Sequence, residues 1–361
     1  MNAMTRRIVI GTAAVSMALT MAACGKAGGS SSSDKSKDKS IGLLLPENAT
    51  TRYEQFDKPL IEKKIKELCS DCTISYDNAA GDPQKQAQQV NTMITKGVKV
   101  LIVDPEDSVG IKSSIQAAVN KGIKVVAYDR LAEGPVSAYV SYDNEKIGEE
   151  QGQALLDAMG ADAKPTSKIV MIDGDPADPN AAMFKAGAHK ILDGKVNIAY
   201  EQSGLWKDTT ANQKMTAAIT QLGAKNIKGV YSANDGMAGG IATALKGAGI
   251  NPPLTGQDAE LPGVQRILAG TQSATIYKPY KPEADATAEI AVNLLEGKSI
   301  TSIATTTSKS ASGQTVPSLL IGATAVTKAN LKDTVVKDGL YPTSQICTTQ
   351  FAAACKAAGI E

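Results

Sequence analysis

Residues 83–130 read PQKQAQQVNTMITKGVKVLIVDPEDSVGIKSSIQAAVNKGIKVVAYDR and contain one pattern twice. In each copy a segment of helical periodicity, residues 83–96 and then 111–121, ends at or just before a glycine that suits a helix C-terminal cap. A short run rich in apolar and β-branched residues follows, at residues 98–103 and again at 123–128. Such runs are typical of parallel strands that are buried on both faces. The stretch therefore predicts consecutive helix–strand units of a parallel sheet.

The same alternation extends in both directions along the chain. Further strands are predicted at residues 41–45, 136–142, 168–172, 196–200, 227–231 and 273–277, and further helices at 145–159, 181–192, 208–222, 236–246 and 282–295. So many units exceed the usual size of one sheet, and 361 residues suffice for two domains. We therefore expect an α/β protein with two doubly wound, Rossmann-like lobes.

The first 40 residues differ in composition from the rest. Two arginines precede an apolar stretch, residues 8–18, that is too short to span a bilayer, and a lipobox-like Met-Ala-Ala-Cys24 follows. Residues 25–40 have no apolar side chain able to join a core and are typical of a flexible tether. We expect a signal peptide at residues 1–23, then a lipidated Cys24 and a tether through residue 40 that anchor the protein outside the cytoplasm. The alternative is an ordinary signal peptide with an incidental Cys24.

Charge and residue usage exclude several functions. Lys plus Arg (38) nearly balances Asp plus Glu (37), so the sequence predicts no basic surface for nucleic acid or for an anionic membrane. A ligand-sensing transcription regulator would need a DNA-binding helix pair ahead of residue 41, where the signal segment and tether are predicted. The only histidine, His189, lies in a predicted helix among solvent-type residues, so we expect a surface residue and no enzyme. Acidic residues at the expected ligand site leave a glycosidase as the alternative.

The four remaining cysteines form two close pairs, Cys69 with Cys72 and Cys347 with Cys355. Outside the cytoplasm such pairs are most simply local disulfides. A redox motif would need its first cysteine at a helix N-terminus, but Cys69 follows an amphipathic run that ends at Leu68. A zinc site would need the two pairs to meet in space, which no feature of the sequence indicates. We expect no metal and no cofactor.

Polar residues follow most of the predicted strands. They are Asp104, Asp129-Arg130, Asp143-Asn144, residues 173–180, residues 202–206, Asn234-Asp235, Gln257-Asp258 and Lys278. Ligands of doubly wound sheets bind beyond the carboxyl ends of the strands, and the phosphate-binding motifs GxGxxG after the first strand and GxxxxGK[ST] are absent from this sequence. Carboxylates, amides and guanidiniums together suit a neutral polyhydroxylated ligand, and Trp206 can cover the C–H face of a sugar. Asp235 alone is expected to serve as a helix cap.

Seven short motifs carry a resemblance to a known family. They are AYDR at residues 127–130, VSYDNEKIG at 140–148, DPADPNA at 175–181, SAND at 232–235, GQDA at 256–259, and AGTQ with YKP between 269 and 279. Together they resemble the bacterial sugar-binding proteins of the ribose, galactose and xylose group, which serve ABC transporters, and the D-xylose-binding proteins most closely. The resemblance covers roughly residues 41–298.

The resemblance implies the type I periplasmic-binding-protein fold, in which two lobes joined by a three-stranded hinge close on a monosaccharide. It places residues 41–142 and 279–315 in the N-terminal lobe, and residues 143–278 and 316–361 in the C-terminal lobe. We expect the tail after Gly297 to supply the last crossover and an extra strand on the second lobe.

The resemblance also implies the ligand contacts. They are Arg52, Tyr53, Asp129, Arg130, Asp178, Asn180, Trp206, Asn234, Asp258 and Lys278. Arg52 is expected to donate to sugar oxygens, Asp129 and Arg130 to clamp neighbouring hydroxyls, and Trp206 to stack on the ring. Tyr53 stands where the D-xylose-binding proteins carry tryptophan, so the first loop is expected to decide which aldose binds, with xylose favoured.

The implied partner is the membrane permease of an ABC importer, which would receive the sugar from an extracytoplasmic, lipid-anchored monomer. The alternative partner is a membrane sensor kinase or chemoreceptor, because both outputs depend on lobe closure. The sequence does not distinguish between them.

Overall fold

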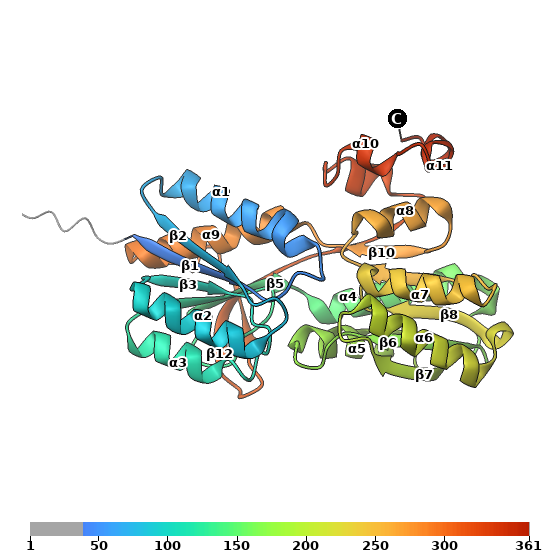
Figure 1. Ribbon diagram of the computed structural model, residues 1–361, viewed down its shortest axis with the longest axis horizontal. Coiled ribbons are helices and arrows are strands. Elements are labelled where there is room, and N and C mark those ends of the chain that lie inside the picture. Colours follow the sequence, from blue (N-terminus) through green and yellow to red (C-terminus); the bar gives the residue numbers. More distant parts are fainter. Residues whose placement is uncertain (1–38, 361) are drawn as a thin grey trace, which may run out of the picture. The chain divides into compact units, whose positions relative to one another are not determined.

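The computed structural model of the chain describes residues 39–360. The predicted signal peptide, Cys24 and nearly all of the tether lie outside this range. Among the described residues, no helix is long and apolar enough to cross a membrane. The described chain builds two sheets, each covered by helices, and forms two α/β lobes (Figure 1).

The first sheet has seven strands within the described range, in the order β11-β12-β5-β4-β3-β1-β2. Their bounds are β1 (Ser40–Leu45), β2 (Thr73–Asn78), β3 (Val100–Val103), β4 (Lys124–Tyr128), β5 (Ala138–Tyr142), β11 (Thr306–Lys309) and β12 (Thr315–Ile321). The pairings are parallel except that β11 runs antiparallel to β12. Nearly all residues of β1 are buried, as expected for an inner strand of a parallel sheet whose two faces are both covered.

Successive residues of β1 pack on opposite faces of this sheet. Leu43 joins one apolar cluster with α1 (Lys58–Leu68) and α9 (Tyr280–Glu296), whereas Leu44 joins another with α2 (Pro83–Lys96) and α3 (Lys112–Asn120). Figure 1 shows α1 and α2 on opposite sides of the sheet. The π-helical turn η1 (Tyr53–Asp57) leads into α1.

The second sheet has six strands among residues 39–360, in the order β13-β10-β9-β8-β6-β7. Their bounds are β6 (Lys168–Asp173), β7 (Asn197–Ser203), β8 (Ile227–Ser232), β9 (Leu254–Gln257), β10 (Ala274–Tyr277) and β13 (Thr324–Thr327). The helices of this lobe are α4 (Asn144–Met159), α5 (Pro179–Leu192), α6 (Asp208–Leu222), α7 (Asp235–Gly247) and α8 (Leu261–Ala269). Strand β13 pairs antiparallel with β10, which confirms the predicted extra strand.

Glycines bring α4 and α5 unusually close together. A Cβ atom on Gly148 of α4 would lie 2.1 Å from the Phe184 carbonyl oxygen of α5. A Cβ atom on Gly187 of α5 would lie 1.9 Å from the Glu145 carbonyl oxygen of α4. Because backbone atoms occupy both positions, only glycine fits at either site without moving a helix.

The chain passes between the lobes after β5, after β10 and after β12, within the described residues. Hydrogen bonds tie these crossovers together: the Tyr142 hydroxyl donates to the Pro279 carbonyl (3.1 Å), and the Asp143 amide donates to the Ile321 carbonyl (3.1 Å). The placement of residues 316–321 in the C-terminal lobe was wrong. They belong to β12, which pairs with β5 in the first sheet, so the last crossover follows Ile321.

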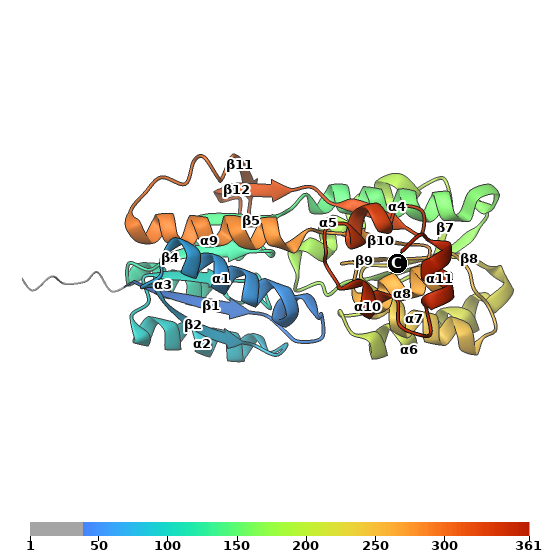
Figure 2. The same ribbon diagram turned by 90° about the horizontal axis from the view of Figure 1, so that it is seen from above.

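A tail of residues 328–360 follows β13 and packs beside α8. It contains η4 (Lys332–Val336), α10 (Thr343–Ile346) and α11 (Ala352–Ala357), and Figure 2 shows α10 and α11 next to α8. Its apolar side chains form a core with α8, and the predicted disulfide between Cys347 and Cys355 is present. We use "the C-terminal tail" for residues 328–360 below.

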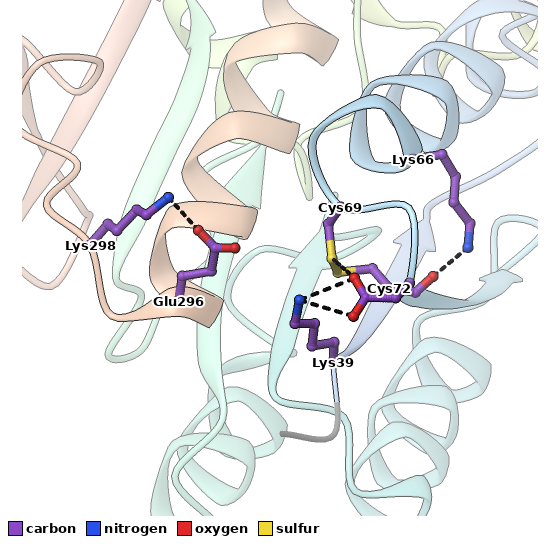
Figure 3. The surroundings of a disulfide bond; sticks show 7 residues. Lys39, Lys66, Cys69, Cys72, Glu296 and Lys298 are labelled. Atoms are coloured by element: carbon purple, nitrogen blue, oxygen red, sulfur yellow. Dashed lines mark hydrogen bonds and ion pairs between the residues drawn. A yellow bond between two sulfur atoms is a disulfide. The ribbon is translucent and has the colours of Figure 1, made fainter. Parts of the chain in front are cut away.

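The second predicted disulfide, Cys69–Cys72, is confirmed at the turn between α1 and β2 (Figure 3). Cys69 is the C-cap residue of α1, which is the wrong helix end for a reactive thiolate. The Lys66 ammonium donates to the Cys72 carbonyl, and Lys39 pairs with Asp71 at 3.0 Å. This disulfide closes a turn on the outside of the first lobe and takes no part in the cavity described next.

Candidate ligand-binding site

Residues of both lobes enclose one cavity at the carboxyl ends of the strands. In this structure the lining side chains leave a free volume of only about 20 Å³, so a ligand can enter only when the lobes part. The structure brings all ten predicted contact residues to the wall of this cavity: Arg52, Tyr53, Asp129, Arg130, Asp178, Asn180, Trp206, Asn234, Asp258 and Lys278. Thr50, Phe184 and Gln257 complete the lining.

Arg130 joins the two lobes across this cavity. It follows β4 and its guanidinium is almost fully buried. Its Nε lies 3.0 Å from Asp178 Oδ2 of the second lobe, and its Nη2 donates to the Tyr53 hydroxyl at 3.1 Å. Two further carboxylates of the first lobe, Asp104 and Glu106, lie 3.6 Å from the same guanidinium. Burial raises the pKa of both, that of Glu106 to about 7, although the Arg130 charge opposes the shift.

The resemblance implied that Arg52 donates to sugar oxygens, but in the structure it donates mainly to other residues of the protein. Its Nε donates to Asp57 (2.8 Å), its Nη1 to Asp129 (3.1 Å) and its Nη2 to Glu283 (2.6 Å). Nη2 also donates to the Tyr128 hydroxyl at 3.3 Å. The guanidinium therefore has little donor capacity left for a ligand, and its main effect is to orient the Asp129 carboxylate.

One guanidinium cannot neutralise three buried carboxylates, so their pKa values separate. Burial raises the pKa of Asp57 to about 6 and that of Glu283 to about 8, against the lowering influence of Arg52. Burial acts on Asp129 as well, but the charges of Arg52, Lys278 and Arg130 outweigh it and lower its pKa. The cluster therefore keeps a proton on Glu283 to a higher pH than on Asp129.

Glu283→Gln is expected to preserve the fold and to flatten the pH dependence of stability. Because the folded-state pKa of Glu283 (about 8) exceeds its unfolded value, the folded form binds an extra proton, and stability falls as pH rises from about 5 to about 8. Glutamine is neutral at every pH, so this loss should shrink by about 1 kcal/mol or more. Urea unfolding at pH 5, 6.5 and 8 measures it. Glu289→Gln, an exposed residue of the same helix, is the control, and equal slopes for both variants would contradict the assignment.

The second lobe presents Asp178 and Asn180 at the start of α5. Asp178 is the N-cap residue, and its Oδ1 accepts from the Asn180 amide at 2.8 Å while Oδ2 faces Arg130. The Asn180 Nδ2 donates to the Asp129 carbonyl of the first lobe at 3.0 Å. Its Oδ1 is buried and accepts no hydrogen bond from any residue in the range 39–360.

The cap of α7 is Asn234, and the prediction that Asp235 caps this helix was wrong. Asn234 Oδ1 accepts from the Met237 amide at 2.9 Å, which leaves its Nδ2 as the group to offer a ligand. Asp235 lies inside the first turn, where it accepts from the Thr275 hydroxyl (2.8 Å) and the Gln272 amide group (2.6 Å). Burial raises its pKa to about 7. Asp235 thus supports the loop behind the cavity.

Asp258 and Lys278 form an ion pair at the wall of the cavity. Their charged atoms lie 2.8 Å apart, and both side chains are buried. Asp258 has a φ of 91°, a region that L-residues rarely adopt. Its carbonyl accepts from the Tyr280 hydroxyl at 2.5 Å, and its amide donates to the Ile276 carbonyl at 2.8 Å. These bonds hold the strained backbone in place, as is common for residues at functional sites.

Trp206 lies in a turn after β7, with a φ of 55°. Its indole ring rests on Gly174, where a Cβ atom would come within 2.0 Å of the ring. The Phe184 ring packs edge-on against it, with centroids 6.5 Å apart. The indole Nε1 is buried and donates to no group in the described part of the chain. The ring is therefore fixed, and its N–H is the one polar group it can offer.

The lining suits an uncharged ligand. Three cations, Arg52, Arg130 and Lys278, balance three carboxylates, Asp129, Asp178 and Asp258, among the described residues of the wall. Unpaired polar atoms of Asn180, Gln257 and Trp206 supply acceptors and a donor. A small neutral molecule with several hydroxyl groups and an apolar face meets these requirements, because hydroxyls both donate and accept.

The three additional lining residues differ in how visible they are in the sequence. Gln257 stands directly before Asp258 in the motif GQDA, so its position already pointed to the site. Phe184 lies within an apolar helix face and is indistinguishable there from a core residue. Thr50 precedes Arg52 in the first loop, and only the path of that loop brings it to the cavity.

Comparison with known proteins places this geometry in a family. A model described as "Periplasmic binding protein domain" matches residues 41–299. The chain is 35% identical over 320 residues to the D-xylose-binding periplasmic protein of Escherichia coli (strain K12), covering 86% of this chain and 93% of that protein. It is 33% identical over 329 residues to the multiple sugar-binding periplasmic receptor ChvE of Rhizobium radiobacter, covering 85% and 92%. The crystal structure of an ABC transporter solute-binding protein from Clostridium phytofermentans with bound β-D-glucose superposes with a TM-score of 0.75 at 26% identity, covering 85% of this chain and 100% of that one.

Proposed function

Because the chain belongs to the periplasmic binding protein family, we propose that it captures one monosaccharide in the cavity between its lobes and delivers it to an ABC importer. The observation that carries the proposal is the cavity itself. It is neutral overall, it is small, and its wall combines paired charges with the fixed ring of Trp206.

We favour a xylose-like aldose as the ligand. The named relatives include a D-xylose-binding protein and a receptor of several sugars, while the solved neighbour holds glucose. Tyr53, the first residue of η1, provides a hydroxyl that accepts a hydrogen bond from Arg130. Such a hydroxyl adds a polar group to this edge of the pocket and is expected to influence which aldose fits.

Binding is expected to act by lobe closure. Arg52, Asp129 and Arg130 come from the first lobe, and Asp178, Asn180, Asn234 and Asp258 from the second. A ligand that contacts both sets stabilises the closed form relative to the open one by its extra contacts. The closed form is then the species that a permease recognises. The alternative output, a sensor kinase or chemoreceptor, would recognise the same form.

We propose binding without chemistry. Each wall carboxylate faces a cation: Asp129 faces Arg52, Asp178 faces Arg130, and Asp258 faces Lys278. A glycosidase needs one carboxylic acid that gives up a proton and one carboxylate that attacks or activates water. The named relatives are binding proteins. Release of nitrophenol from an aryl glycoside by the purified protein would contradict this proposal.

The anchor is a further part of the proposal and rests on the sequence alone. Lipidation of Cys24 would hold the binding lobes near the membrane through the tether of residues 25–40. Mass spectrometry of the protein purified from membranes tests it, because a Cys24→Ala variant should lose the acyl mass and leave the membrane fraction.

Direct binding measurement tests the sugar assignment. Trp206 is the only tryptophan, so its fluorescence should respond to the right sugar among xylose, glucose, arabinose, galactose and ribose. Calorimetry should show weaker binding for Asp258→Ala by about 1–3 kcal/mol, because ligand hydroxyls lose an acceptor, and weaker binding for Trp206→Ala. Asp162→Ala, at an exposed position, is the control. Unchanged affinity for both cavity variants would refute the site.

A further inference from the structure

The C-terminal tail contacts the first lobe as well as the second. It is built on α8 of the second lobe through a core that includes Leu331, Val335 and Tyr341. Tyr341 is 3% exposed, and its ring also packs against Phe56 of η1, with centroids 5.5 Å apart and ring planes at 72°. Because η1 follows β1 of the first sheet, this aromatic contact crosses between the lobes.

Phe56 connects this contact to the cavity. Its other neighbour is Tyr280, whose ring centroid lies 5.2 Å away. The Tyr280 hydroxyl donates to the carbonyl of Asp258, and the Arg52 guanidinium lies 4.7 Å from the centre of the Tyr280 ring. Tyr280 therefore touches one cavity residue from each lobe. The three rings form a continuous path from the tail to both of them.

A polar contact crosses between the lobes near the same place. The Thr51 amide of the first lobe lies 3.4 Å from Glu260 Oε1, at the start of α8, and donates to it. Glu260 is 5% exposed. Burial raises the pKa of the Tyr341 hydroxyl, and the nearby Glu260 adds to this shift. The aromatic rings thus belong to a seam that joins the lobes beside the residues that begin the first loop.

We propose that the C-terminal tail, through Tyr341, is a clasp that holds the closed lobes together and positions two cavity residues for the ligand: Asp258 directly, and Asp129 through Arg52. This inference rests on the proposed function and adds a residue outside the cavity to it. An interlobe contact is present in the closed form and lost in the open one, so it shifts the equilibrium toward closure and raises the apparent affinity. It should also slow ligand release, since release requires the lobes to part.

The test compares Tyr341→Ala, Phe56→Ala and the double variant in the full chain. Calorimetry gives the affinity for the sugar that binds most tightly, and stopped-flow tryptophan fluorescence gives its release rate. Each single variant is expected to weaken binding about tenfold, mainly by faster release, because aromatic pairs contribute energy beyond their buried area. The affinity of the double variant should lie within about twofold of that of either single variant, since both substitutions remove the same contact.

Controls separate the clasp from a merely structural role. Tyr341→Phe keeps the ring and should bind within about twofold of the unaltered protein. Phe56→Ala leaves the tail intact, so it tests the contact even where Tyr341→Ala disturbs the tail. Single-variant affinities within twofold of the unaltered protein would overturn the proposal, and so would independent losses that multiply in the double variant.

The same experiment distinguishes failure of the clasp from failure of the proposed function. If Trp206→Ala weakens binding and Phe56→Ala does not, the cavity assignment stands and the clasp is wrong. If no sugar binds the unaltered protein, the proposed function itself fails.

Discussion

Arg130→Met is expected to abolish sugar capture and to lower the free energy of unfolding by about 3–5 kcal/mol at pH 8. The substitution keeps much of the side-chain volume but leaves the buried Asp104 and Asp178, and the partly buried Glu106, without their shared cation. Breaking a buried charge pair by removing one partner costs far more than the pair contributes, because the remaining charge stays desolvated. Calorimetry measures capture, and urea unfolding measures stability.

The pH dependence of this loss identifies its cause. The three carboxylates already have raised pKa values in the folded protein, and losing the Arg130 charge raises them further. A carboxyl group whose folded pKa exceeds its unfolded value binds a proton on folding, so it destabilises the fold increasingly as pH rises. The deficit of Arg130→Met should therefore shrink between pH 8 and pH 5. A deficit that is constant over this range would mean that lost packing, rather than uncompensated charge, is responsible.

Arg130→Lys is the matched control for geometry. It keeps the positive charge but loses the planar set of donors that reaches Asp178 and Tyr53 together. We expect most of the stability to return while sugar affinity remains reduced. Full recovery of affinity would show that charge alone is needed at this position.

Gly148→Val is expected to lower the free energy of unfolding by about 3 kcal/mol and to weaken sugar binding. Its side chain would meet the Phe184 carbonyl, where even a Cβ atom lies at 2.1 Å, so α4 and α5 must move apart. Phe184 lines the cavity, and α5 begins beside Asp178 and Asn180, so the displacement reaches the ligand. Urea unfolding and calorimetry on the same preparation measure both effects.

Gly247→Ala is the control for this substitution. Gly247 ends α7, has no atom within 4 Å of an added Cβ, and does not adopt a positive φ. Alanine there should be neutral or stabilising by up to about 1 kcal/mol. Equal stability of the two variants would show that the close approach of α4 and α5 can relax at little cost.

Local periodicity predicted most of the fold, and the missed elements are those in which that signal is weak. Strand β9 has only four residues, Leu254–Gln257, and two of them are glycine and glutamine. Strand β2 is an edge strand with no fully buried residue, so it lacks an apolar run. Strand β12 was assigned to the wrong lobe because its partner β5 is distant in the sequence. The periodicity of a segment does not indicate which other strand it will pair with.

For the candidate site, too, the sequence predicted the residues at strand ends but not the contacts between residues that are distant in the chain. Residues at the ends of predicted strands, such as Asp129 and Lys278, follow from the rule that ligands bind at the carboxyl ends of parallel strands. The carboxylates around Arg52 did not follow, because Glu283 comes from a helix 231 residues further along the chain. Within its helix Glu283 is one polar residue on a buried face, and only the folded chain shows the cation that it meets. The role of Arg52 changed for the same reason, from a ligand donor toward a residue that orients Asp129.

The path of the chain through its two sheets also governs when this protein can fold. The first sheet needs β12 and the second needs β13, and both strands lie within residues 315–327. Neither half can complete its hydrogen-bonded ladder until nearly the whole polypeptide is available, so the late steps involve contacts of large sequence separation and are slow. A growing chain with this topology stays without a finished domain until its end emerges.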